Sequence, residues 1–358
     1  MTPLPSSSRR LGVPGRGAAL VLSACLVAGM AVGGAPAPAA STPDGGSEGG
    51  SAGPPVSGAA VVDSTLRPLR QGDRDAPQPV PPAFHAWAGL DTLHLGLTAL
   101  PVLPGESVGL GGEALRLVVQ AGGVQSTGPG RWRWTAPNAP GAYALRMEAE
   151  GGAVLHLTAW VAHPAEWVRN GSLRGYRIGS YRPLPPGGNE VHRPPDGFVE
   201  VGARDRDLLV SPRFTVGQFL CKQAGEPRFL ALSGPLLVKL EAVADRAAAT
   251  GWDPGALVVM SGYRTPAYNR AIGNTTSLSR HLWGDAADLY LDGDADGEMD
   301  DLDGNGRVDL ADARVMARWV EEAVGRPGVR PGGLALYRRN AVHGPFVHVD
   351  ARGARARW

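Results

Sequence analysis

The sequence predicts two folded regions of different class, an all-β region at residues 84–164 and an α+β region at residues 165–358. Short apolar segments with period-two alternation, separated by glycine and proline turns, fill the first region and are typical of half-buried strands. A segment with helical periodicity, followed by an apolar strand, predicts mixed helices and strands in the second. Residues 41–83 are dominated by Gly, Pro, Ser and Ala. Because they offer no periodic apolar face, we expect a disordered linker there.

Residues 1–40 have the composition of a signal peptide. Two arginines precede an apolar run at residues 18–32, and the small residues that follow suit cleavage near Ala39. We therefore expect an exported protein of the periplasm or cell envelope. No transmembrane span is expected in the mature chain, because the run is short and rich in Ala and Gly. The sequence LSAC ending at Cys25 is similar to a lipoprotein cleavage box, which leaves open a lipid anchor through Cys25.

Charge and cysteine content exclude some partners and some covalent structure. The chain of 358 residues has a formal net charge of +1 and 19% charged residues, so it lacks the basic excess of proteins that bind nucleic acid. Besides Cys25 it contains only Cys221, and removal of the signal peptide would leave one thiol and no intrachain disulfide. Cys221 has apolar neighbours, and we expect it to be a packing residue rather than a nucleophile.

The all-β region contains five segments in which apolar and polar residues alternate: TLHLGLTAL, ALRLVVQA, RWRWTAP, YALRMEAE and AVLHLTAWVA. Their spacing predicts a β-sandwich. The stretch GRWRWTAPNAPGAYALRME resembles immunoglobulin-like modules of bacterial envelope proteins, and this resemblance implies an immunoglobulin-like sandwich. No group of catalytic residue types occurs in these segments, so we expect a spacer or docking module.

The first helix of the α+β region is predicted from SGPLLVKLEAVADRAAATGW. Apolar residues recur there at steps of three and four, Ser233 can cap the start, and Gly251 can end the helix. The following ALVVMSGYR predicts a buried strand that runs into a loop. Upstream, FTVGQFLCK is compatible with a strand or a short helix.

Two histidines and an aspartate suggest a metal site. The stretch SRHLWGDAADL places His281 and Asp288 seven residues apart, and FVHVD places His348 near the end of the chain. A catalytic zinc ion takes three protein ligands, often His and carboxylate, and leaves one position open. By itself the His/Asp pair is also compatible with a polar turn ahead of a strand, because Gly284 interrupts any helix that would align the two.

Four motifs in a fixed order carry a resemblance to a known family: SGYR at 261–264, HLWGDAAD at 281–288, GGLALY at 332–337, and FVHVDARGARARW from Phe346 onward. They resemble the zinc D-Ala-D-Ala carboxypeptidase superfamily, which also includes lysostaphin-type and hedgehog-type relatives. The chain is most similar to the periplasmic murein endopeptidase branch, over about residues 165–358. The resemblance implies an α+β zinc peptidase domain with a central antiparallel sheet that hydrolyses peptide bonds of peptidoglycan, in stem peptides or in cross-links.

The resemblance also implies roles for individual residues. His281, Asp288 and His348 would bind zinc, and Arg264 would hold a substrate carboxylate or the carbonyl oxygen of the scissile bond. A zinc ion polarises the carbonyl and lowers the pKa of a water molecule to about 7. An arginine can then stabilise the developing oxyanion.

This sequence has no general base at the positions where many relatives carry one. Many relatives carry an acid three residues before the last zinc histidine, or a histidine two residues before it, and this chain has Pro345 and Phe346 there. His343 is the nearest titratable candidate, and Asp350 is the second. On a strand Asp350 shares a face with His348, so it can orient the ligand or touch substrate, or form a surface ion pair.

An acidic insertion at residues 291–325 follows the His/Asp motif and contains DGDADGEMDDLDGNGRVDLAD. An EF-hand loop needs oxygen ligands at positions 1, 3, 5, 7, 9 and 12, with Gly at position 6. One register meets this pattern with Asp301, Asp303, Asn305, the carbonyl of Arg307, Asp309 and Asp312. An overlapping register uses Asp292, Asp294, Asp296, Asp300 and Asp303. The spacing resembles dockerin-type loops and predicts one or two structural Ca²⁺ ions; a solvated acidic loop is the alternative.

Three functions follow from these observations. The leading hypothesis is a zinc metallopeptidase that acts on peptidoglycan, as a murein endopeptidase or a D,D-carboxypeptidase. A noncatalytic cell-wall binding protein that contains zinc and calcium is the second. A calcium-dependent adhesion module is the third, and it leaves SGYR and the two histidine motifs unexplained.

Overall fold

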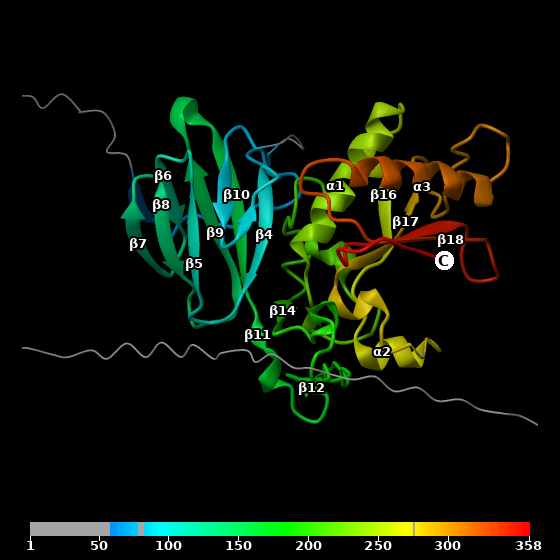
Figure 1. Ribbon diagram of the computed structural model, residues 1–358, viewed down its shortest axis with the longest axis horizontal. Coiled ribbons are helices and arrows are strands. Elements are labelled where there is room, and N and C mark those ends of the chain that lie inside the picture. Colours follow the sequence, from blue (N-terminus) through cyan, green and yellow to red (C-terminus); the bar gives the residue numbers. More distant parts are fainter. Residues whose placement is uncertain (1–57, 78–81, 275) are drawn as a thin grey trace, which may run out of the picture. The chain divides into compact units, whose positions relative to one another are not determined.

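The computed structural model describes residues 58–77, 82–274 and 276–358 (Figure 1). The predicted signal peptide at 1–40, Cys25 as the predicted site of a lipid anchor, and the linker up to residue 57 lie outside the described residues. Within the described part of the chain, no helix has the length and apolar character needed to cross a membrane.

The all-β region consists of two five-stranded sheets (Figure 1). The first sheet has the order β1 (Ala59–Val62), β6 (Arg116–Val119), β9 (Gly141–Glu148), β10 (Val154–Val161) and β4 (Leu97–Val102). The second has the order β3 (Asp91–Thr92), β2 (Ala86–Ala88), β5 (Ser107–Gly112), β8 (Arg131–Thr135) and β7 (Gly123–Gly128). Residues of both sheets share one apolar core.

Strand β8 shows why the alternating segments pack in this way. Trp132 and Trp134 are buried in the shared core, whereas Arg131 and Arg133, which alternate with them, are exposed. This is the arrangement that period-two alternation predicts. The predicted strands are therefore present, and the immunoglobulin-like type of the two-sheet region stays a prediction.

The structure corrects the predicted linker at 41–83. Its residues 59–62 form β1, which pairs in parallel with β6, and Arg70 forms an isolated bridge with Leu208. The sequence AAVV at this strand is too short for alternation to be detected, and its stability comes from the hydrogen-bonding edge that β6 offers. The expectation of disorder is wrong for residues 58–77.

The α+β region is built on a third five-stranded sheet with the order β16 (Leu257–Ser261), β17 (Ala286–Leu291), β19 (Phe346–Asp350), β18 (Gly333–Tyr337) and β20 (Ala356–Arg357). The pairs from β16 to β18 are antiparallel, and β20 joins β18 in parallel at the edge. Smaller sheets comprise β11 (His163–Pro164), β14 (Gly197–Val201) and β15 (Arg228–Leu230), and β12 (Ser172–Leu173) with β13 (Tyr176–Arg177). The central antiparallel sheet is as predicted.

Three α-helices accompany this sheet: α1 (Gly234–Ala249), α2 (Pro266–Ala271) and α3 (Leu310–Val324). Helix α3 packs against α1 and against strands β18 and β19. The predicted limits of α1 are confirmed, since Ser233 is its N-cap residue and Gly251 follows its end with a φ of +94°. The ambiguous FTVGQFLCK forms a short 3-10 turn at Val216–Phe219, and Cys221 is buried in the core as expected.

Candidate metal centre

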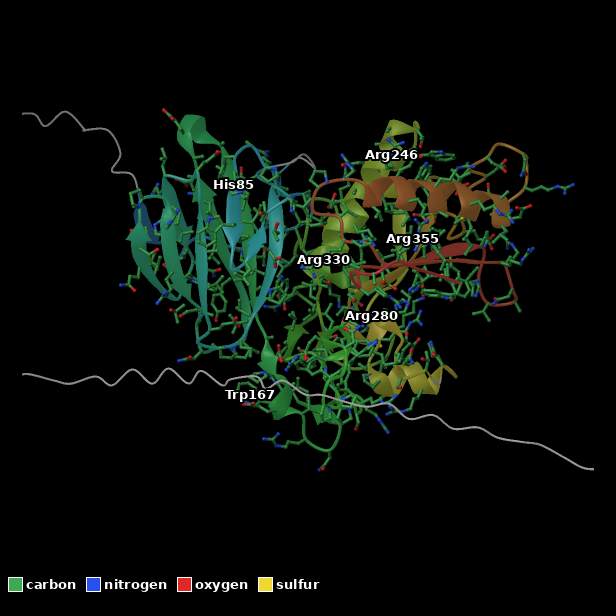
Figure 2. All side chains as sticks on the ribbon, viewed as in Figure 1. His85, Trp167, Arg246, Arg280, Arg330 and Arg355 are labelled. Atoms are coloured by element: carbon green, nitrogen blue, oxygen red, sulfur yellow. The ribbon has the colours of Figure 1, made fainter. Side chains whose placement is uncertain are left out.

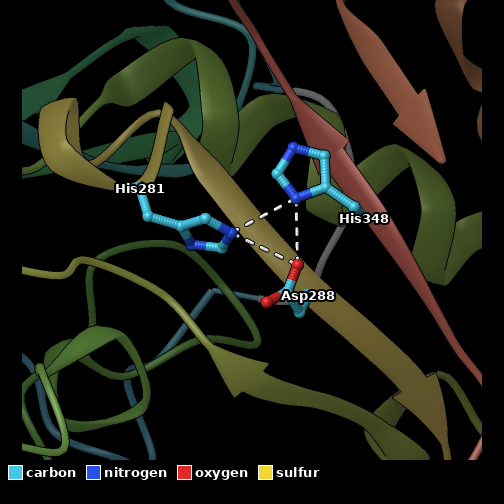
Figure 3. Close-up of side chains that lie close together, drawn as sticks. All are labelled: His281, Asp288 and His348. Atoms are coloured by element: carbon cyan, nitrogen blue, oxygen red, sulfur yellow. Dashed lines mark hydrogen bonds and ion pairs between the residues drawn. The ribbon is translucent and has the colours of Figure 1, made fainter. Parts of the chain in front are cut away.

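Three elements bring the two histidines and the aspartate together (Figure 3). His281 lies on the 3-10 turn η6 (Arg280–Trp283), Asp288 on β17 and His348 on β19. Asp288 and His348 are direct partners in the register of these neighbouring strands. Gly284 ends η6 with a φ of +67°, and a Cβ there would meet the carbonyl oxygen of Ala231 at 2.1 Å. Only glycine fits the turn that carries the chain from His281 into β17.

The donor atoms of the three side chains form a small triangle. His281 Nε2 is 3.2 Å from His348 Nδ1 and 3.2 Å from Asp288 Oδ1, and His348 Nδ1 is 2.9 Å from Asp288 Oδ1. A tetrahedral zinc ion with bonds of about 2.0–2.1 Å holds its ligands roughly 3.3 Å apart. Two imidazole nitrogens and a carboxylate oxygen at these separations therefore fit such an ion. All three side chains are buried.

Neighbouring groups fix the orientation of each donor. The Nδ1–H of His281 donates to the carbonyl oxygen of Gly262 at 2.7 Å, which leaves Nε2 for a metal. Arg264 donates from Nη2 to Oδ2 of Asp288 and from Nε to the hydroxyl of Ser261 at 2.9 Å. Such outer contacts select the tautomer and rotamer that a metal ligand needs.

Burial and charge set the protonation of the donors. Burial lowers the pKa of His281, which favours the neutral ring that binds a metal. Burial acts to raise the pKa of Asp288, but the neighbouring His281 and His348 outweigh it and hold that pKa well below its usual range. Burial acts to lower the pKa of His348, but the hydrogen bond to Asp288 and the nearby carboxylate of Asp350 outweigh it and raise that pKa. Asp288 is thus a carboxylate at neutral pH.

The triangle lines a cavity of about 450 Å³. The other lining residues are Arg264, Asn274, Thr276, Leu278, Ser279, Arg280, Tyr337, Phe346, Arg352 and Trp358. Tyr337 and Phe346 stack with ring centroids 4.5 Å apart, and the indole N–H of Trp358 donates to the hydroxyl of Tyr337 at 3.2 Å. These three rings give the cavity one aromatic wall. Arg352 and Trp358 also line the cavity; the motif after His348 contains both, but the sequence alone gave them no role.

Asp350 supports the site from the same face of β19 as His348. Its side chain is 0% exposed, and Oδ2 lies 3.6 Å from Nε2 of His348. Oδ1 accepts hydrogen bonds from the backbone N–H of Gly333 at 2.8 Å and from Nε of Arg352 at 2.9 Å. Lys239 of α1, itself buried, donates to the backbone carbonyl of Asp350. The predicted orienting role fits this geometry, and the alternatives of a surface ion pair or a free base do not.

His343 lies apart from the cavity. Its Nδ1 is 2.8 Å from the carbonyl oxygen of Gly344, its Nε2 is 2.8 Å from the side-chain amide of Asn340, and its ring packs edge-on against Phe346. It is not among the cavity-lining residues. The turn at 340–343 binds the imidazole within its own loop, so the geometry does not support His343 as the general base.

The acidic insertion folds into two loops with the same hydrogen-bond pattern, nine residues apart. The N–H of Gly297 donates to Oδ2 of Asp292 at 3.0 Å, and the N–H of Gly306 donates to Oδ2 of Asp301 at 2.6 Å. Both glycines have positive φ, +89° and +79°, as the sharp turn at position 6 requires. The repeat seen in the sequence is therefore also a repeat of backbone structure.

The loops gather two groups of carboxylates whose oxygens lie within 4.8 Å of one another: Asp292, Asp294 and Asp300, and Asp301, Asp303 and Asp312. Asp303 belongs to the second group only, so the structure does not place it in both loops as predicted. Asp296 does not join either group, and neither does the carboxylate of Asp309, which caps α3 by accepting from the N–H of Ala311. Arg307, predicted to contribute its carbonyl, is exposed.

Comparison with known proteins finds one family model that is similar to a part of the chain. A family model described as Peptidase M15 matches residues 213–303. The matched segment contains Arg264, His281 and Asp288 and ends before His348. No curated protein and no solved structure matches the chain. The match supports the resemblance to the zinc D-Ala-D-Ala carboxypeptidase superfamily and suggests a metallopeptidase.

Proposed function

We propose that this protein is a zinc-dependent peptidase that hydrolyses a peptide bond in peptidoglycan, as a murein endopeptidase on cross-links or as a D,D-carboxypeptidase on stem peptides. One observation carries the proposal. The donor atoms of His281, Asp288 and His348 lie within 3.2 Å of one another at the wall of a cavity. Two of these residues also fall in the segment that matches Peptidase M15.

The cavity residues have complementary roles in such a reaction. A zinc ion held by the three donors would polarise a substrate carbonyl and activate water. Arg264 lines the same cavity and is fixed by Asp288 and Ser261, so its positive charge is preorganised beside the position where an oxyanion develops. The wall of Tyr337, Phe346 and Trp358 would offer an apolar surface to the substrate.

A noncatalytic cell-wall binding protein with the same metals is the second candidate. It is favoured by one observation: His343 lies outside the cavity, and Asp350 is fully buried and hydrogen-bonded to Gly333 and Arg352. Neither predicted base is therefore placed to take a proton from water. In this case the site would bind the stem peptide without cleaving it.

Incubation of the purified chain with muropeptides separates the two candidates. We expect new peptide products by mass spectrometry, their loss on addition of a zinc chelator, and their return when zinc is restored. Absence of any chelator-sensitive product, with retained binding to isolated peptidoglycan, would favour the noncatalytic candidate. Absence of both would reject a role at the cell wall.

We propose in addition that the insertion at 291–325 binds one or two Ca²⁺ ions for structural purposes. The two carboxylate groups of the insertion and the glycine at position 6 of each loop support it. Asp312 is 0% exposed and accepts from the N–H groups of Leu302 and Asp303 at 2.7 and 3.2 Å, so the second loop is tied to the first turn of α3. An ion there would stabilise the junction with that helix.

The remaining assignments are also proposals. The composition of residues 1–40 supports export to the periplasm or cell envelope. The two-sheet region, which we propose to be immunoglobulin-like, would serve as a spacer or docking module, since its alternating strands carry no cluster of catalytic residue types.

A further inference from the structure

The cavity carries more positive than negative charge. Arg264, Arg280 and Arg352 line it, and Asp288 is the one acidic residue among the described lining residues. Arg280 (Figure 2) is 4% exposed and its guanidinium is engaged by Asp285 and by the carbonyl oxygen of Val191. The guanidinium groups that a ligand can meet in the cavity are therefore those of Arg264, which is paired with Asp288, and Arg352, which is paired with Asp350.

Arg352 presents a rigid guanidinium with one edge in use. Its Nε lies 2.9 and 3.0 Å from the two carboxylate oxygens of Asp350, and Nη2 donates to Oδ2. Among the described residues its Nη1 has no hydrogen-bond partner, and the side chain remains 25% exposed. Because Asp350 is fully buried, it holds the guanidinium in a fixed plane. This leaves the second edge free for a planar anion, the kind of ligand that arginine binds best.

This second edge lies close to the metal centre. Arg352 and His348 contact the same oxygen, Oδ2 of Asp350. They also pack on the same indole: the Cζ of Arg352 is 5.4 Å from the ring centroid of Trp358, and the His348 ring is 5.3 Å from it. An anion bound by Arg352 would therefore lie close to a substrate group bound at the triad. It would lie near the Nε2 edge of His348, whereas Arg264 and Asp288 lie near the Nδ1 edge.

We infer that Arg352 is a specificity residue that binds a free carboxylate next to the scissile bond of the substrate. The inference rests on the proposed peptidase function and narrows it. Arg264 serves the carbonyl that is attacked, and Arg352 selects peptides in which the residue on the amine side of that bond carries an ionised carboxyl group. A terminal amino acid has such a group, and so does a diamino acid linked through its side chain. An interior bond of an ordinary protein chain does not, and the site would leave it intact.

The test compares carboxylate and amide forms of the same substrates in the zinc-loaded protein. The substrates are an acylated D-alanyl-D-alanine peptide and a cross-linked muropeptide, each with the carboxylate next to the scissile bond free or converted to its amide. We expect the wild type to favour the free acid by about tenfold or more in kcat/KM, the usual value of a hydrogen bond to a charged group. Arg352→Met should cut both forms at similar rates, and Arg352→Lys should keep part of the preference.

Arg355→Gln is the matched control. Arg355 lies three residues further along the chain, pairs with Glu321 at the surface and does not line the cavity (Figure 2). This variant should keep the wild-type preference. If Arg352→Met lowers cleavage of acid and amide equally, Arg352 only supports Asp350 and the inference is wrong. A wild type that does not distinguish acid from amide would overturn it without any mutation.

A binding measurement keeps this test independent of catalysis. In the zinc-free full-length chain, N-acetyl-D-alanyl-D-alanine and its amide are titrated against wild type and Arg352→Met by ligand-observed NMR. We expect the wild type to bind the acid about tenfold more tightly than the amide, and Arg352→Met to bind the two equally. This result supports the inference even if no substrate is cleaved, in which case only the peptidase proposal fails. Equal binding of acid and amide by the wild type rejects the role of Arg352.

Discussion

The carboxylates of Asp288 and Asp350 lie on opposite edges of one imidazole ring. Asp288 Oδ1 is 2.9 Å from Nδ1 of His348, and Asp350 Oδ2 is 3.6 Å from its Nε2. Each carboxylate is bound in turn by an arginine, Arg264 or Arg352. These contacts fix the orientation of the His348 ring, so that its Nδ1 faces Nε2 of His281.

The first prediction concerns this outer carboxylate. Asp350→Asn keeps the shape of the side chain but removes the charge that faces Nε2 of His348, so zinc affinity should fall by about 10- to 100-fold. Competition with a chromophoric chelator measures it. Asp285→Asn is the control, because Asp285 is also buried and paired with an arginine, Arg280, without contact to the triad. Equal losses of zinc affinity in the two variants would show that the effect is not specific to the carboxylate that faces His348.

The second prediction concerns the triad itself. His281→Ala removes one of three donors, and we expect loss of bound zinc and of muropeptide cleavage, with the zinc content of purified protein measured by mass spectrometry. The wild type should carry one zinc per chain at this site. Cleavage that survives the substitution at a similar rate would contradict the assignment.

The third prediction concerns His343. Because its ring nitrogens contact Gly344 and Asn340 rather than the cavity, His343→Ala should change kcat/KM by no more than about twofold, below the 10²-fold or larger effect typical of a general base. The pH profile of cleavage should keep its shape. A loss of two orders of magnitude would restore His343 as the base and show that its loop moves when substrate binds.

The triad was predictable from the sequence because motif order supplies information that spacing alone lacks. Asp350 was also predictable as an orienting residue, because strand alternation places it on the face of His348, but other residues around the site were not. Lys239 lies among the apolar positions of α1 and would ordinarily face solvent, yet it is buried against a carbonyl 111 residues away, a contact that no local pattern encodes. His343 was misplaced for the same reason, since its position depends on the turn formed with Asn340 and on the ring of Phe346. Strand β1 was missed because β6, its partner, is distant in sequence.

The fourth prediction uses the pKa of Lys239, which burial lowers from 10.5 to about 8. Between these values the unfolded chain binds a proton that the folded chain has largely lost, so the free energy of unfolding gains a contribution that rises with pH. From pH 7.5 to 9.5 the wild type should gain about 1 to 2 kcal/mol relative to Lys239→Met. Urea unfolding of both proteins at the two pH values measures it. A difference that stays constant would show that Lys239 titrates normally.

The fifth prediction concerns the acidic loops. If they bind calcium, Ca²⁺ added to chelator-treated protein at one hundred times Kd should raise the free energy of unfolding by about 3 kcal/mol. The Tm should rise with it. Asp301→Asn should weaken binding in isothermal titration, because Asp301 belongs to one of the carboxylate groups. Asp91→Asn, at an exposed aspartate of the two-sheet region, should have no effect. A Tm that is indifferent to calcium would identify the insertion as a solvated acidic loop.

The outer contacts of the triad also bear on metal exchange. His281 is oriented by a backbone carbonyl, Asp288 by Arg264 and His348 by Asp350, so each donor has a protein partner that persists when no ion is bound. Many small zinc domains fold only with the ion in place and unfold on chelation. At this triad the donors are held together without an ion, so loss and reloading of a bound metal would need no refolding. The exchange rate would then follow from dissociation of the ion and its passage through the cavity, and the protein could be stripped and recharged repeatedly within its folded lifetime.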